Sequence, residues 1–315
     1  MGHLLEVKNL SVSIDGPAGE VQAVRDVSFS LKKGEVLAIV GESGCGKSVT
    51  SQCLMRLNPE PPGFFEGGEI LYKGKDVLKM NKKELRQFRG KEISYIFQDP
   101  MTSLNPTMRI GKQIEEVFVG RKGMSAAEKK AKALEILKMV GISDGERRYK
   151  QYPHELSGGM KQRVMIAIAL VGSPSIVIAD EPTTSLDVTI EAQILDVLKN
   201  LQKTLGTSII LITHDLGVIN EMADDVAVMY CGQVVEKAPV RSIFGDNSYL
   251  HPYTEGLLYS IPRLDTPTGI RLEAIPGAVP HPLDLPKGCK FAPRCKYATD
   301  KCREMEPELN EVEPG

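Results

Sequence analysis

The stretch Gly41–Ser48 reads GESGCGKS, and it directly follows the apolar run Val36–Val40. It fits the pattern G-x-x-x-x-G-K-[S/T] of a phosphate-binding loop placed between a strand and a helix. In such a loop the glycines let backbone N–H groups point at phosphate oxygens, and the start of the helix adds a favourable dipole. We expect that helix to run from Lys47 to about Leu57. The stretch therefore predicts a nucleotide-binding site in an α/β protein.

Two side chains of this loop have specific expected roles. Lys47 should reach the β- and γ-phosphates, and the Ser48 hydroxyl should bind Mg²⁺. The alternative is a glycine-rich turn that binds nothing, and the buried strand expected in front of the loop argues against it. The other residues expected to contact the nucleotide are Ser43, Gly44, Cys45, Gly46 and Val49.

A pair of carboxylates follows the apolar run Ile176–Ala179. Asp180 would hold Mg²⁺, through water, at the end of a buried strand. Glu181 lies one residue further and would act as the general base that polarises the attacking water. Paired acids are also common at solvated strand ends, but behind a phosphate-binding loop this arrangement predicts the Walker B element of a nucleotide hydrolase.

A second distinctive stretch, Leu156–Arg163, reads LSGGMKQR. Gly158 and Gly159 free the backbone to approach a γ-phosphate, and the Ser157 hydroxyl can donate a hydrogen bond to it. An ordinary helix start capped by serine would look similar up to this point. We therefore expect Ser157, Gly158 and Gly159 to bind nucleotide or to begin a helix.

Over its whole length this second stretch resembles the signature of the ATP-binding cassette (ABC) ATPases, including Gln162 and Arg163. The resemblance covers roughly residues 4–245. It implies that Gln98 is the Q-loop glutamine that touches Mg²⁺, that Ser185–Asp187 is the D-loop, and that His214 is the switch histidine at the γ-phosphate. It also implies a head-to-tail dimer, in which each ATP lies between the loop Gly41–Ser48 of one subunit and Ser157–Gly159 of the other.

The chain departs from this family at one position. The aromatic residue on which the family usually stacks adenine is replaced by Ile14. We therefore assign recognition of the base to no residue.

The pattern of apolar residues predicts an α/β fold with a mostly parallel core sheet. Residues 4–32 alternate apolar and polar residues around a loop at Asp15–Gly19, as antiparallel strands do. Residues 99–165 are charged and helix-prone, with an amphipathic stretch from Ser125 to Met139, and are predicted to form a helical subdomain. Strands that alternate with helices indicate a sheet covered on both faces. We predict a nucleotide-binding domain over residues 1–250 and a proline- and cysteine-rich extension over 251–315.

Composition limits the possible partners. The chain has 39 basic and 41 acidic residues, which gives no electrostatic case for binding nucleic acid. No apolar run approaches the roughly 20 residues that span a bilayer, and the N-terminus lacks the pattern of a signal peptide. We expect a cytosolic protein that is held at the inner face of a membrane through a partner.

Two further segments narrow the resemblance to ATPases of bacterial dipeptide/oligopeptide importers, the peptide/nickel group. They are Gln98–Pro106, QDPMTSLNP, with which the stretch Glu181–Thr189 agrees, and, in the extension, Ile275–Pro280 followed by Gly288–Cys295. The resemblance implies two integral-membrane permeases, a second ATPase subunit, identical or paralogous, and an external solute-binding protein. It places the chain at the cytoplasmic face of a bacterial membrane. The alternative is a soluble ABC ATPase that acts in DNA repair or on ribosomes.

The extension contains Cys289, Cys295 and Cys302, spaced C-x5-C-x6-C. Clustered thiolates can bind an iron–sulfur cluster or Zn²⁺. Resemblance to the importer group implies a [4Fe–4S] cluster, although the fourth cysteine usual there is missing. We therefore expect a [4Fe–4S] cluster, with zinc as the second choice and three reduced, unliganded thiols as the remaining alternative.

Overall fold

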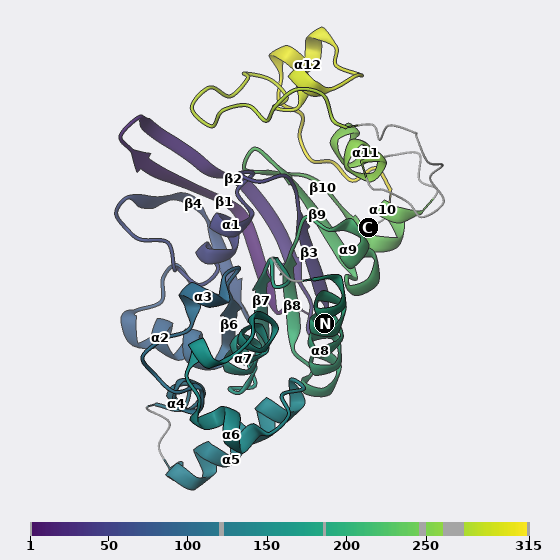
Figure 1. Cartoon of the computed structure of the whole chain (residues 1–315). Helices are drawn as coiled ribbons and strands as arrows, with labels where there is room; N and C mark the ends of the chain where they lie inside the picture. Colours follow the sequence, from purple (N-terminus) through teal and green to yellow (C-terminus); the bar gives the residue numbers. More distant parts are fainter. Residues whose placement is uncertain (1, 120–122, 185–186, 246–249, 261–273, 314–315) are drawn as a thin grey trace, which may run out of the picture. The chain divides into compact units, whose positions relative to one another are not determined.

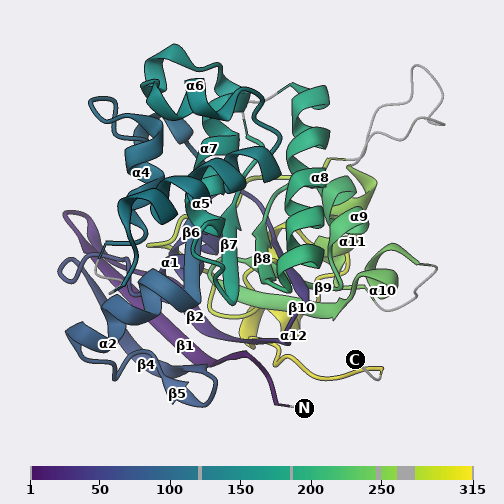
Figure 2. The same cartoon turned by 90° about the horizontal axis from the view of Figure 1, so that it is seen from below.

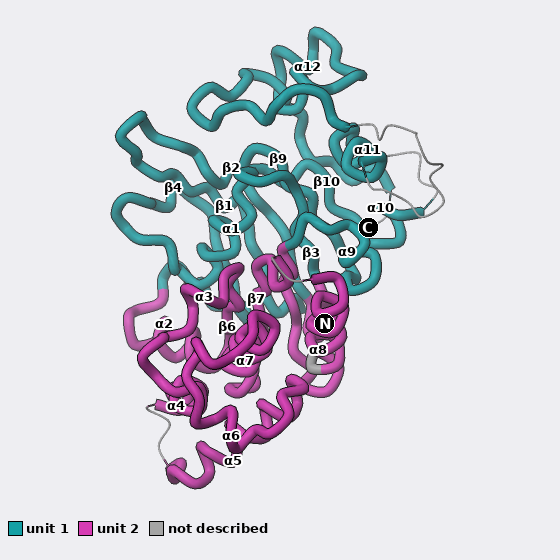
Figure 3. The backbone as a smooth tube through the Cα atoms, in the orientation of Figure 1, with its two compact units in different colours: residues 1–31, 37–79, 213–315 teal, residues 32–36, 80–212 magenta. Residues whose placement is uncertain are grey.

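The computed structural model describes residues 2–119, 123–184, 187–245, 250–260 and 274–313. The chain divides into two compact units, which Figure 3 colours separately. Unit 1 comprises residues 1–31, 37–79 and 213–315, and unit 2 comprises residues 32–36 and 80–212. These two units do not coincide with the domains predicted from the sequence, 1–250 and 251–315. That division into domains stays a prediction.

Unit 1 contains an antiparallel sheet with strand order β2-β1-β4-β5. Strands β1 (Leu5–Gly16) and β2 (Gly19–Leu31) form the hairpin that the alternating pattern predicts, and they are the purple strands of Figure 1. β4 (Gly63–Tyr72) pairs with β1, and β5 (Lys75–Asp76) pairs with β4. Leu5, Val7, Leu10 and Val12 of β1 are buried with the near-alternation of a half-buried strand, and a register shift between Val7 and Leu10 accounts for the extra residue there.

Unit 1 also carries the strand that leads into the phosphate-binding loop. Leu37–Val40 of β3 (Val36–Val40) pair in parallel with β9 (Asp225–Tyr230), which pairs in antiparallel with β10 (Gln233–Pro239). All five residues of β3 are buried. The α-helices of unit 1 are α1 (Lys47–Cys53), α9 (Leu216–Met222), α10 (Val240–Phe244), α11 (Pro252–Tyr259) and α12 (Asp300–Glu304), and a 3₁₀ turn, η3, spans Ala292–Arg294.

Unit 2 is built on three parallel strands, β6 (Ile93–Ile96), β7 (Ile176–Asp180) and β8 (Ser208–Ile212). Every residue of β7 and β8 is buried, which is typical of parallel strands covered on both faces. Helix α7 (Gly158–Leu170) packs against β6 and against α8 (Val188–Leu205).

The rest of unit 2 is helical. Helices α4 (Ile110–Glu116), α5 (Ala126–Met139) and α6 (Gly145–Lys150) pack on one another, as Figure 2 shows. Ser125 begins α5 with a capping box, because its hydroxyl accepts from the N–H of Glu128 and the Glu128 carboxylate accepts from the N–H of Ser125. The other elements are α2 (Lys82–Gln87), a π-helix η1 (Phe88–Glu92), α3 (Pro100–Ser103) and a 3₁₀ turn η2 (Pro153–Glu155).

These elements agree with the α/β prediction and with the expected alternation of strands and helices. The helix expected from Lys47 to about Leu57 is shorter, because α1 ends at Cys53 and turns follow it. Within the described part of the chain, no helix has the length and apolar character needed to cross a membrane.

Candidate nucleotide site

The glycines of the loop Gly41–Ser48 have positive φ, which residues with a Cβ rarely adopt, and at two of them a Cβ would also clash. Gly41 and Gly46 have φ of +157° and +98°. A Cβ at Gly41 would lie 2.2 Å from the carbonyl oxygen of Met229, and one at Gly46 would lie 2.5 Å from that of Ala23. The glycines of the motif therefore hold the loop against neighbouring backbone, as well as exposing its N–H groups.

Lys47 lies at the first position of α1 and is almost fully buried. Its Nζ donates to the carbonyl oxygens of Gly41 at 2.7 Å and Glu42 at 3.0 Å. A buried ammonium that is held by its own loop provides a fixed positive charge for a phosphate. A Cβ built at Gly44 would meet no atom within 4 Å, so the turn of the loop has open space beside it. The buried ammonium and the open space at Gly44 suit a loop that binds the phosphates of a nucleoside triphosphate.

The remaining predicted contacts of the loop differ in exposure. Ser43 is exposed, whereas Ser48 and Val49 are partly buried in the first turn of α1. Cys45 is buried, and burial raises the pKa of its thiol although the Lys47 charge opposes the rise. Cys45 is therefore a neutral packing residue, and its backbone carbonyl accepts from the N–H of Gly232 at 2.9 Å.

In unit 2 the two predicted carboxylates lie at the end of β7. Asp180 is buried and accepts a hydrogen bond of 2.7 Å from the Tyr95 hydroxyl on β6. Glu181 follows the strand with φ of +45°, a conformation that non-glycine residues rarely adopt. Its N–H donates to the carbonyl of Ile212 on β8 at 2.8 Å, which fixes this bend.

The structure brings Gln98 and Glu181 together. The Gln98 Nε2 donates to Oε2 of Glu181 at 2.7 Å, and the Thr184 hydroxyl donates to the same oxygen at 2.9 Å. Two donors on one oxygen orient the carboxylate, which is what a general base requires. This geometry joins the predicted Q-loop residue to the predicted base.

The signature stretch begins helix α7. The Ser157 hydroxyl accepts from the N–H of Met160 at 3.4 Å, a long capping bond, and Ser157 and Gly158 are exposed. A Cβ at Gly159 would lie 2.9 Å from Ile190 Cγ2 of α8, so this glycine serves helix packing. The Gln162 side-chain amide donates to the carbonyl of Pro182, which ties α7 to the segment that follows Glu181.

The other predicted positions are placed as follows. His214 is exposed just beyond β8, in unit 1. Asp187 caps α8 by accepting from the N–H of Ile190 at 2.9 Å, whereas Ser185 and Leu186 of the expected D-loop lie outside the described residues. Ile14 is partly buried in β1. The roles assigned to all these site residues stay predictions.

The donor set expected for Mg²⁺ has suitable chemistry. Ser48 offers a hydroxyl, Asp180 a carboxylate and Gln98 an amide oxygen, and Mg²⁺ prefers oxygen ligands. The Tyr95 hydroxyl donates to Oδ2 of Asp180, so this carboxylate is oriented by a neighbour.

The prediction of a [4Fe–4S] cluster is wrong. Among the described residues, which include Cys289, Cys295 and Cys302, no group of three or more Cys, His, Asp or Glu side chains is arranged to hold a metal ion. All three thiols are free and partly buried, in different surroundings. Burial raises the pKa of the Cys289 thiol, while Cys302 Sγ lies 3.2 Å from the Thr299 hydroxyl. The same finding gives zinc no site in this part of the chain, because spacing along the sequence does not fix where the sulfurs point.

Three supporting residues of unit 2 were not given a role by sequence reasoning. They are Tyr95, Thr184 and Gln162, which hold Asp180, Glu181 and the Pro182 carbonyl respectively. Tyr95 reaches Asp180 because β6 and β7 are parallel neighbours, with Tyr95 opposite Ile178. That register cannot be read from either strand alone. Thr184, by contrast, lies three residues beyond Glu181 and could have been suspected.

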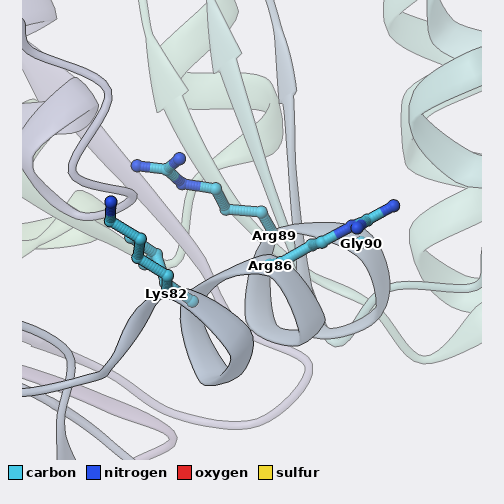
Figure 4. Close-up of a pocket in the computed structure, with 5 residues that line it drawn as sticks. Lys82, Arg86, Arg89 and Gly90 are labelled. Carbon is cyan, nitrogen blue, oxygen red and sulfur yellow. The ribbon is translucent and has the colours of Figure 1, made fainter.

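A separate hollow of about 410 Å³ lies on unit 2, and its lining residues belong to the segment that precedes β6. Figure 4 shows the side chains of Lys82, Arg86 and Arg89, from α2 and η1, around it. Leu85 and Gly90 complete its lining. The hollow contains none of the predicted site residues, and we assign it no chemistry.

Comparison with known families gives two matches. Residues 24–184 match the family described as ABC transporter. Residues 235–302 match the family described as oligopeptide/dipeptide transporter, C-terminal region. The first match includes the phosphate-binding loop, Glu181 and the signature stretch, and the second includes Cys289, Cys295 and Cys302.

Curated relatives are similar over nearly the whole chain. The oligopeptide transport ATP-binding protein OppD of Bacillus subtilis is 56% identical over 309 residues, which are 98% of this chain and 86% of the relative. The dipeptide transport ATP-binding protein DppD of Lactococcus lactis is 53% identical over 312 residues, which are 99% of this chain and 88% of the relative.

Solved structures are similar over about three quarters of the chain. One is a dimeric ATP-binding cassette in a post-hydrolysis state bound to ADP and Pi, with a TM-score of 0.67 and 29% identity over 75% of this chain and 99% of that one. Another is CbiO1 from Clostridium perfringens, part of an ABC transporter complex, with the same TM-score and identity over 78% and 92%. The predicted P-loop α/β fold is confirmed by these likenesses.

Proposed function

The chain belongs to the ABC transporter family of ATPases and carries the C-terminal region of oligopeptide/dipeptide transporters, and from this premise we propose how it works. It is the subunit that hydrolyses ATP to power the uptake of dipeptides or oligopeptides through membrane permeases. The observation that carries the enzymatic part is the Glu181 carboxylate, held by Gln98 and Thr184 directly after a buried strand. The alternative role in DNA repair or on ribosomes finds no support in the two relatives described above, OppD and DppD, which are peptide transport ATP-binding proteins.

The proposed reaction is the in-line attack of water on the γ-phosphate of ATP, which releases ADP and phosphate without a covalent intermediate. Glu181 accepts the proton of the attacking water, and the hydrogen bonds on its Oε2 keep the carboxylate turned in one direction. Lys47 and His214 bind the γ-phosphate. Mg²⁺, held by the Ser48, Gln98 and Asp180 side chains, would neutralise charge that develops on the phosphate oxygens.

We propose that the ATPase works as a head-to-tail pair. Ser157, Gly158 and Gly159 would then serve the nucleotide bound by the partner subunit, which is this chain or a paralogue. The exposure of Ser157 and Gly158, together with the dimeric state of a similar solved cassette, supports this arrangement. The transport path is formed by two integral-membrane permeases, with this chain at the cytoplasmic face of the membrane and an external solute-binding protein that delivers the peptide.

The role of Glu181 can be tested on the assembled importer. Glu181→Gln retains the size and the hydrogen-bonding ability of the side chain but is a far weaker base. We expect turnover to fall by roughly 10²- to 10⁴-fold while ATP affinity stays close to wild type. A hydrolysis rate near that of wild type would show that Glu181 is not the base.

The role of Ser157 has a matched control in the same unit, because Ser125 also caps a helix. Ser157→Ala should leave ATP binding by the isolated chain unchanged and reduce turnover by the assembled importer. Ser125→Ala should reduce stability by about 1 kcal/mol through the lost cap and leave turnover unchanged. Equal turnover for the two variants would reject a role for the signature stretch in hydrolysis.

A further inference from the structure

The phosphate-binding loop is held from the C-terminal part of the chain through one residue, Glu42. The Glu42 N–H donates to the Tyr253 hydroxyl at 2.8 Å. Its carboxylate accepts two parallel hydrogen bonds from Arg294, with Nη1 at 2.6 Å from Oε2 and Nη2 at 3.0 Å from Oε1. Such a bidentate pair fixes both position and orientation. All three residues belong to unit 1, so the contact lies within one compact body.

Arg294 is itself fixed in place. Only 4% of its side chain is exposed, its Nε donates to the carbonyl of Pro276 at 2.9 Å, and it lies within 6.0 Å of the ring centres of Tyr230 and Phe291. Tyr253 is fully buried and its ring packs on the same two aromatic rings. A buried, pre-ordered guanidinium loses little freedom when it binds a carboxylate.

Glu42 also touches the residue that is expected to bind phosphate. Its backbone carbonyl accepts from Lys47 Nζ at 3.0 Å. Glu42 is therefore held at three points: the N–H by Tyr253, the carboxylate by Arg294, and the carbonyl by Lys47. A shift of Glu42 would move the carbonyl that positions the Lys47 ammonium.

We propose that Arg294 and Tyr253 are positioning residues for ATP binding, which hold Glu42 and so keep the phosphate-binding loop in the conformation that accepts the nucleotide. Through these two residues, the extension over residues 251–315 would influence the affinity of the chain for ATP. This inference rests on the proposed function, because it requires that Gly41–Ser48 bind ATP.

The test is the affinity of the purified full-length chain for MgATP, measured by isothermal titration calorimetry. Arg294→Met keeps much of the apolar stem and removes the guanidinium. We expect its Kd to rise about tenfold, the size expected for loss of a charge-assisted hydrogen bond. Arg294→Lys, which keeps the charge without the fork, should recover part of the affinity. Tyr253→Phe keeps the ring and removes one acceptor, and should raise the Kd by a smaller factor.

Two further variants separate positioning from general stability. Arg303→Met removes an exposed arginine of the same extension. Arg303 pairs with Asp300, and its loss should leave the Kd for MgATP unchanged. Glu42→Gln combined with Arg294→Met should weaken binding no more than Arg294→Met alone, because both act through one contact.

The outcomes are distinguishable. Folded Arg294→Met and Tyr253→Phe proteins that bind MgATP as wild type does would overturn the proposal, even if their thermal unfolding midpoints were lower. If Arg294→Met does not fold, Tyr253→Phe decides alone, because it removes only a hydroxyl. A wild-type chain that binds no MgATP would overturn the proposed function itself, whereas wild-type binding with unchanged variants would reject this inference only.

Discussion

The phosphate-binding loop of unit 1 and the Glu181 segment of unit 2 hold their functional groups by different means. The loop depends on backbone conformation and charge: glycines with positive φ, a buried ammonium on loop carbonyls, and an ion pair with Arg294, which is 252 positions away in the chain. The Glu181 segment depends on hydrogen bonds from neutral donors on neighbouring elements, which are Tyr95, Gln98 and Thr184.

This difference determines which changes each region tolerates. A loop held by close backbone contacts should be disrupted by a single added methyl group, and the buried His251, which holds the N–H of Tyr253, should make unit 1 respond to pH. A carboxylate held by neutral donors should lose its orientation in small steps as each donor is removed. Three substitutions test these expectations.

The largest effect is expected for Gly46→Ala. The added Cβ would lie 2.5 Å from the Ala23 carbonyl oxygen at a φ of +98°, so both the clash and the backbone conformation are unfavourable. We expect the free energy of unfolding to fall by about 3 kcal/mol. Gly44→Ala is the control, because its φ is +80° but its Cβ would meet no atom within 4 Å, and about 1 kcal/mol is expected. Equal losses in urea unfolding would show that close backbone contact does not hold the loop.

The next effect concerns pH and unit 1. Burial lowers the pKa of His251 to about 4, from 6.5. Between these values the unfolded chain binds more protons than the folded one, so stability should decrease as pH falls through this window. At pH 5 the loss relative to pH 8 should be about 2 kcal/mol.

The matched variant for this prediction is His251→Asn. It keeps a side-chain acceptor for the Tyr253 N–H, which His251 Nδ1 now accepts, and it leaves Glu236 in place beside residue 251. Urea unfolding at the two pH values should show a smaller difference for the variant. A difference as large as that of wild type would assign the pH dependence to other groups.

The smallest effect is expected for Tyr95→Phe in unit 2. Loss of the hydroxyl removes the hydrogen bond to buried Asp180 and should cost about 1 kcal/mol of stability. ATP hydrolysis by the importer should also need more Mg²⁺ for half-maximal rate, because Asp180 is no longer oriented. Tyr297→Phe, at an exposed tyrosine that bonds Glu255, should leave the Mg²⁺ requirement unchanged. If Tyr95→Phe and Tyr297→Phe show the same Mg²⁺ dependence, then the orientation of Asp180 does not affect Mg²⁺ binding.

Much of the fold could be predicted because its signals are local. The alternation of β1 and β2, the Ser125 cap and the buried runs of β3, β7 and β8 each depend on residues close in sequence. The phosphate-binding loop could be predicted for the same reason, because its glycines, lysine and serine stand at a fixed spacing in the sequence. Contacts such as Tyr95 with Asp180 and Arg294 with Glu42 join segments that are distant in the sequence, and no local sequence pattern predicts them.

The cysteines of the extension show that a regular spacing in the sequence can also lead to a wrong prediction. Their spacing was regular enough to suggest a cluster, yet ligand geometry depends on where η3, α12 and the turns between them direct each sulfur. The described residues offer no metal-holding group there. Arg294, which lies between Cys289 and Cys295, has the clearer structural connection, because it reaches the phosphate-binding loop.

We propose that ATP hydrolysis by this chain, with Glu181 as base, drives the import of peptides. The direct test is uptake of a labelled oligopeptide by vesicles that contain the complete importer, with ATP on the side of the ATPase. We predict ATP-dependent accumulation for wild type and none above background for Glu181→Gln, although both bind ATP. Accumulation by the Glu181→Gln importer at the wild-type rate, or by wild type without ATP, would show that hydrolysis at Glu181 does not drive import.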